Sequence, residues 1–242
     1  ELTNLTITDS AGATFGGNVT LINDFIVTDS SSDIIFNGTL NAAGLSLAGE
    51  AYNLQFNGGG TITDATTLAN TGTVSIGADG TTTQFTGGLT TITGSSQNLN
   101  GTIKTIDTAM VISNGEAITL SGATTLSSIG DGVDGNDGNI TLGGIVNSAT
   151  EGVDETLTVD VGTGTLLISG VVGGVSNKAL GAIVINNAGG LFDLNAAITL
   201  AASINVSGNS NLGASVTTTG AQTYGGTATL STDVTLDSTG DT

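Results

Sequence analysis

The sequence predicts an all-β fold, a parallel β-helix (β-solenoid) with rungs of roughly 20 residues. Three observations indicate it. Apolar and polar residues alternate in short runs between clusters of Gly, Asn, Asp and Ser, an aromatic residue recurs at a regular spacing, and one segment of the chain is repeated further on.

The strands are predicted from the period-two alternation of apolar residues with Thr and Ser. Such runs occupy residues 5–8, 19–21, 39–40, 45–47, 61–63, 74–76, 157–161 and 183–185. Clusters of Gly, Asn, Asp and Ser at 57–60, 77–80 and 207–210 favour tight turns with left-handed backbone. No stretch shows the three-four spacing of an amphipathic helix over more than one turn, so we expect strands and turns only.

The rung length is predicted from an aromatic residue that is followed by Gly and then by a strand. This pattern begins at Phe15, Phe36 and Phe56, which are 21 and 20 residues apart, and looser versions begin at Phe85 and Tyr224. About 20 residues make one rung of a β-solenoid, and rungs stack at roughly 4.8 Å. The chain would then form about twelve rungs and a rod of order 60 Å.

Residues 111–131 and 221–241 align without gaps at an offset of 110 residues, with nine identities that include Leu120/Leu230 and Leu126/Leu236. A period of this length also suits a string of Ig-like sandwiches. The absence of Trp, the small number of aromatic residues and the 20-residue spacing favour the solenoid. We expect 1–242 to be a single continuous β-solenoid segment, a fragment of a longer array, with a loop insertion near 130–139.

The charge is strongly acidic, with 21 Asp and Glu against Lys104 and Lys178 and a formal net charge of −19. Two lysines cannot form the basic patch that nucleic acid or an anionic membrane requires, so neither is expected as a partner. No run of eighteen apolar residues occurs, and direct membrane insertion is not expected either. Without His or Cys, catalytic constellations reduce largely to carboxylates scattered in turns, so we expect no enzyme.

Asp131, Asp134 and Asp137 recur every third residue among glycines. Ca²⁺ prefers several oxygen ligands from a pliable loop, so these residues are the best metal candidates in the chain. The segment lacks the closing Glu of the helix-loop-helix calcium pattern and does not match the nonapeptide calcium-binding repeat. Two interpretations stay open, a calcium loop and a solvated loop between rungs. No other cofactor is expected.

Two further patterns have a functional and a structural interpretation. Strand threonines can form an ice-binding face, but Thr also suits any outward strand position, and these pairs do not recur at one interval. Asn-x-Ser/Thr sequons can accept glycans, but we interpret them first as turn and ladder residues. The Thr pairs are Thr6/Thr8, Thr61/Thr63, Thr91/Thr93 and Thr217/Thr219, and the sequons begin at Asn4, Asn18, Asn37, Asn100, Asn139 and Asn205.

The segment 221–230, AQTYGGTATL, followed by the sequence DVTL at 233–236, resembles a recurring sequence motif of the filamentous-haemagglutinin-like bacterial surface adhesins. The stretches 138–148, 157–164 and 170–174 are similar to their repeats as well. The resemblance covers residues 111–242 well and the first half only in style. It implies a secreted, right-handed β-helical stalk that is exported by a two-partner or autotransporter route and displayed on a Gram-negative-type cell. No catalytic residue comes with it.

We therefore expect a structural stalk or adhesin segment of a large secreted protein at the bacterial cell surface. Its partners would be other copies or flanking repeats of the same protein and the surface of a host or neighbouring cell. The alternative is a self-assembling extracellular filament or surface-layer subunit, because exposed strand ladders at the ends of a rod pair readily with neighbours.

Overall fold

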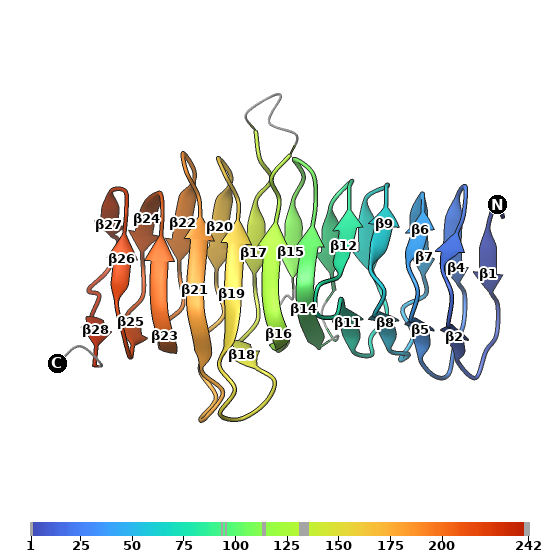
Figure 1. Ribbon diagram of the computed structural model, residues 1–242, viewed down its shortest axis with the longest axis horizontal. Helices are drawn as coiled ribbons and strands as arrows, with labels where there is room; N and C mark the ends of the chain where they lie inside the picture. Colours follow the sequence, from blue (N-terminus) through green and yellow to red (C-terminus); the bar gives the residue numbers. More distant parts are fainter. Residues whose placement is uncertain (1, 93, 95, 113–114, 131–135, 240–242) are drawn as a thin grey trace.

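A computed structural model describes residues 2–92, 94, 96–112, 115–130 and 136–239. These residues form strands and turns without a helix, wound as a right-handed β-solenoid of about 11 turns with rungs of ~21 residues (Figure 1). The predicted fold class is confirmed. At roughly 4.8 Å per rung, the solenoid is about 50 Å long.

The rungs contribute strands to three faces. Face A holds β2 (Ala13–Phe15), β5 (Ile34–Phe36), β8 (Leu54–Phe56), β11 (Val74–Ile76), β18 (Val146–Ser148), β25 (Val216–Thr218) and β28 (Leu236–Ser238). Face B holds β3 (Val19–Thr20), β6 (Leu40–Ala42), β9 (Gly60–Ile62), β12 (Thr82–Phe85), β19 (Glu155–Asp160), β21 (Leu180–Asn186) and β26 (Gln222–Tyr224). Three long strands, β14 (Gln97–Lys104), β16 (Ile118–Ser127) and β23 (Ile198–Val206), run across faces A and B.

Face C lies opposite, behind face B in Figure 1. Its strands are β1 (Leu5–Ile7), β4 (Asp24–Val27), β7 (Gly44–Leu47), β10 (Thr66–Leu68), β13 (Leu89–Thr91), β15 (Met110–Ile112), β17 (Ile140–Leu142), β20 (Thr165–Ile168), β22 (Leu191–Leu194), β24 (Asn209–Leu212) and β27 (Ala228–Leu230).

Each strand pairs in parallel with the equivalent strand of the next rung, so that Ile34, Leu54 and Val74 occupy one column. Parallel pairing between rungs excludes Ig-like sandwiches, whose strands pair in antiparallel fashion. Asn side chains extend the ladder at the corners. The Oδ1 atoms of Asn18 and Asn139 accept the backbone N–H groups of Thr39 and Thr165 at 3.1 and 2.8 Å. The interpretation of these two sequon asparagines as ladder residues is therefore confirmed.

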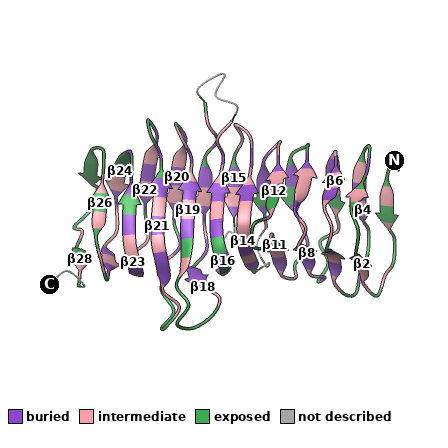
Figure 2. Ribbon diagram, viewed as in Figure 1, coloured by how far each residue is buried: buried purple, intermediate pink, exposed green. Residues whose placement is uncertain are grey.

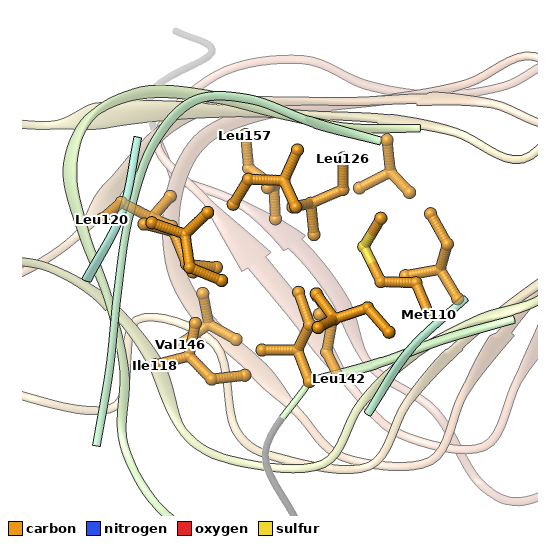
Figure 3. Packing of buried hydrophobic residues seen from close by; sticks show 14 of the residues in the cluster. Met110, Ile118, Leu120, Leu126, Leu142, Val146 and Leu157 are labelled. Carbon is orange, nitrogen blue, oxygen red and sulfur yellow. The ribbon is translucent and has the colours of Figure 1, made fainter. Parts of the chain in front are cut away.

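The core is a continuous and mainly aliphatic column between the three faces. Alternate residues of each strand point inward because side chains of a strand alternate between its two sides, and Figure 2 shows the resulting pattern of buried and exposed positions. Figure 3 shows one section of the column, in which side chains from all three faces meet, among them Met110, Ile118, Leu126 and Leu142.

The aromatic period is confirmed at three positions. Phe15, Phe36 and Phe56 stack in successive rungs of face A, with ring centroids 5.0 and 5.7 Å apart and interplanar angles of 10° and 8°. The looser versions also precede Gly and a strand, but they lie at a different corner of the rung. Phe85 and Tyr224 lie on face B, in register with Ile62 and Val206. A single aromatic residue marks a strand but does not specify which face the strand joins.

The 110-residue repeat does not place equivalent residues at equivalent positions. Leu120 lies on face A but its match Leu230 lies on face C, and Leu126 lies on face B but Leu236 on face A. The cause is variation in rung length. Hydrogen-bonded residues of adjacent rungs are 20 residues apart at Asp33/Asn53, 26 at Asp137/Thr163 and 18 at Asp193/Asn211. The two copies therefore share a strand-turn pattern and not a structural unit.

Candidate functional site: a carboxylate at one corner and a groove at another

The predicted metal loop joins β16 to β17. Asp131 and Asp134 lie outside the described residues, as does half of the predicted insertion, at 131–135. Asp137 is described, and it connects the loop to the next rung. Its Oδ2 accepts the backbone N–H of Thr163 at 2.8 Å and the Thr163 hydroxyl at 3.1 Å, while Oδ1 accepts the backbone N–H of Gly130 at 3.2 Å. The Asp137 N–H in turn donates to Thr163 Oγ1 at 3.0 Å.

These donors favour the ionised carboxylate. The Thr163 N–H, and after it the Gly130 N–H and the Thr163 hydroxyl, hold the pKa of Asp137 below its ordinary value, against a smaller opposing effect of desolvation. The side chain thus has a structural role whether or not a cation binds. Within the described part of the chain no three acidic, His or Cys side chains lie together as a metal site, and the calcium loop stays a prediction.

The threonine pairs do not gather on one face. Thr6 lies on face C, Thr61 on face B and Thr217 on face A, while Thr91 is buried and Thr93 is outside the described residues. The pairs therefore do not build a flat ice-binding face. Face B instead carries a single column of Thr in four successive rungs, Thr82, Thr102, Thr125 and Thr158, which the sequence analysis did not detect because rung lengths vary there.

Two loops project together from the corner between faces A and B, and we call residues 149–154 and 173–179 the ledge. They follow β18 and Val172 and project at the lower edge of Figure 1. Hydrogen bonds join them: the Gly152 N–H donates to the Asn177 carbonyl at 2.9 Å, and the Ser148 hydroxyl donates to the Ala179 carbonyl at 2.6 Å. The Asn147 side chain accepts the Val175 N–H at 3.2 Å. The loops are thus fixed to each other.

A groove of about 480 Å³ lies beside the ledge. It exists because the next rung has no loop at this corner, where β23 continues from face A to face B as one strand with an irregularity in register between Ile198 and Ala201. Glu151, Asp154 and Asn177 line it from the ledge, and Leu200, Ala202 and Thr219 from the following rungs. The groove combines two carboxylates with apolar side chains, a combination typical of binding sites.

The ledge is not apparent from the sequence, because its Gly, Ser and Asn residues resemble those of every other turn. The available signal was spacing. The inward residues Ile118, Val146, Val172 and Ile198 occupy one column of face A but stand further apart than the 20-residue period requires.

In comparisons with known proteins, no family model, curated protein or solved structure matches the chain. The fold alone defines its class, that of the repetitive β-solenoid proteins. Within the described residues no helix is long and apolar enough to cross a membrane.

Proposed function

We propose that this chain is a structural segment of a secreted bacterial surface adhesin, a stalk that extends a binding region from the cell and offers lateral surfaces of its own. One observation carries the proposal, the continuous column of inward aliphatic residues under three parallel ladders. Such a column makes a rod in which each rung contacts mainly its neighbours, and rods of this kind serve by reach and by lateral surface.

The composition supports an exposed, extended role. The net charge of −19 keeps separate rods apart in solution, and the absence of Cys leaves backbone ladders to stabilise the fold without disulfides. The likeness of 221–236 and 138–164 to the repeats of filamentous-haemagglutinin-like adhesins favours the cell surface over other locations for such a rod.

A second candidate is a self-assembling extracellular filament of the same rods. The parallel ladders of faces A, B and C run along the whole rod, and ladders of this kind can pair with those of a second copy or of flanking repeats where they meet end to end.

Immunogold electron microscopy of cells that make the protein tests both candidates, with antibodies raised against residues 2–239. The stalk predicts gold outside the outer membrane on single projecting rods and loss of the signal after protease treatment of intact cells. An ordered polymer would support the filament instead. Gold confined to the cell interior would refute both.

A further inference from the structure

Large apolar side chains are exposed at two kinds of place in the described chain. Leu2, Ile22, Leu230 and Leu236 lie in the first two rungs and in the last ones. The others, Ile145, Val153 and Val175, lie on the ledge or directly beside it and are 42–45% exposed. Exposed apolar side chains direct attention to the ledge as a place for an interaction site, but none of these three lines the groove beside it.

The two charged side chains that line the groove beside the ledge are both acidic. Glu151 and Asp154 line the groove, whereas Lys178, the one cation in the ledge, is not among the lining residues. A second copy of this chain would bring a formal net charge of −19 to an acidic groove, which disfavours self-association here. Charge complementarity therefore favours a partner that carries positive charge.

The shape of the groove favours an extended backbone. One side of the loop at 173–179 packs against the loop at 149–154 (Figures 1 and 2). The other side of the loop at 173–179 stays uncovered, because β23 in the next rung has no loop at this corner. The groove thus occupies the position that a third ledge loop would take. An extended peptide of about six residues has the length of such a loop, and its side chains alternate between two sides.

We propose that the groove beside the ledge is a docking site for an extended peptide segment of another protein in which basic and apolar residues alternate. Its apolar side chains would contact Ala179, Leu200 and Ala202, and its basic side chains would pair with Glu151 and Asp154. The proposal rests on the proposed function only for the location of the partner, which would be outside the cell. Docking itself can be measured with the isolated chain.

The test uses the purified chain and a fluorescently labelled octapeptide of alternating Lys and Val, titrated by fluorescence anisotropy at low salt. Glu151→Gln with Asp154→Asn is expected to weaken binding about fivefold or more, since exposed ion pairs each contribute a modest free energy. Thr219→Trp, which fills the groove, is expected to weaken it about tenfold or more. An alternating Ser and Val octapeptide is expected to bind about fivefold more weakly than the Lys peptide.

Matched variants control for charge and for bulk. Glu50→Gln with Asp79→Asn removes two carboxylates from exposed turns elsewhere, and Thr223→Trp adds an indole to an exposed position of β26. Each control is expected to change binding less than about twofold at low salt. No binding of the Lys peptide, equal losses in test and control variants, or equal binding of the Ser peptide would overturn the proposal. The microscopy of cells is independent of these results, so either proposal can fail alone.

Discussion

The carboxylate of Asp137 accepts the backbone N–H of Thr163 at 2.8 Å, across the step from one rung to the next. The two residues lie at the corner between faces B and C, where the regular ladder of strands is interrupted. Side-chain acceptors satisfy the N–H groups there that a neighbouring strand would otherwise bond. The corner is thus held by a charged group, and its stability should depend on pH.

Asp137→Asn should therefore remove a pH-dependent part of the stability. The pKa of Asp137 is lowered in the folded chain, so its contribution is complete above the unfolded value of about 3.9 and is lost as pH falls through that value toward the folded pKa. The difference in urea midpoint between the wild type and the variant should be largest near neutral pH and shrink below about pH 4. Asp79→Asn, in an exposed turn, serves as the control. A difference that stays constant with pH would contradict this account.

The calcium hypothesis makes a separate prediction for the same residue. If Asp131, Asp134 and Asp137 are ligands, Ca²⁺ should release or absorb heat on titration and raise the melting temperature, because a ligand that binds only the folded state stabilises it. Asp137→Asn should abolish both effects, and Asp79→Asn should leave them intact. A titration in which neither the heat nor the melting temperature changes refutes calcium binding and leaves Asp137 as a hydrogen-bond acceptor.

The stack of phenylalanines should carry much of the stability of the N-terminal rungs. Phe36 is 1% exposed and contacts the rings of Phe15, Phe25 and Phe56, with centroids 5.0, 5.0 and 5.7 Å away. Phe36→Ala should lower the free energy of unfolding by about 3–5 kcal/mol through lost burial and the cavity left behind. Gln55→Ala, at an outward position of the next rung, should change it by less than about 0.5 kcal/mol.

Hydrogen exchange is the appropriate readout for Phe36→Ala, because solenoid rungs can open independently of distant ones. Protection should fall most in the rungs that contain β2, β5 and β8 and least beyond β19. Uniform loss of protection along the chain would instead indicate a single cooperative unit.

The sequence allowed the fold class to be predicted because the inward columns are apolar in most rungs, which leaves a visible alternation of apolar and polar residues. It also allowed the Phe15, Phe36 and Phe56 stack to be predicted, because those rungs have nearly constant length. The assignments failed where length varies. Phe85 and Tyr224 share the aromatic-Gly-strand pattern of Phe15 but lie on face B, and the two copies of the 110-residue repeat lie on different faces, because position on a face depends on the length of the corners in between.

The groove beside the ledge could not be predicted for a related reason. The groove forms where a rung with a long loop at the corner between faces A and B is followed by a rung without a loop there. Its presence therefore depends on the difference between two adjacent rungs, and neither sequence segment alone predicts it. Asp137 was predicted as a functional residue. Its contact with Thr163 could not be predicted, because it depends on which residues of adjacent rungs stack at the same corner.

Two glycines that the sequence assigns to turns should differ sharply when replaced by Ala. Gly60 has φ +129°, and a Cβ there would lie 2.0 Å from the carbonyl oxygen of Leu40, which cannot move without breaking the ladder between β6 and β9. Gly80 has φ +72° but nothing within 4 Å. Gly80→Ala should therefore cost about 1–2 kcal/mol from backbone strain alone. Gly60→Ala should cost more than about 3 kcal/mol or prevent folding of those rungs. Thermal melts of both variants measure the difference in stability. Equal losses of stability would show that the close contact between the Leu40 carbonyl oxygen and position 60 imposes no constraint beyond the backbone strain.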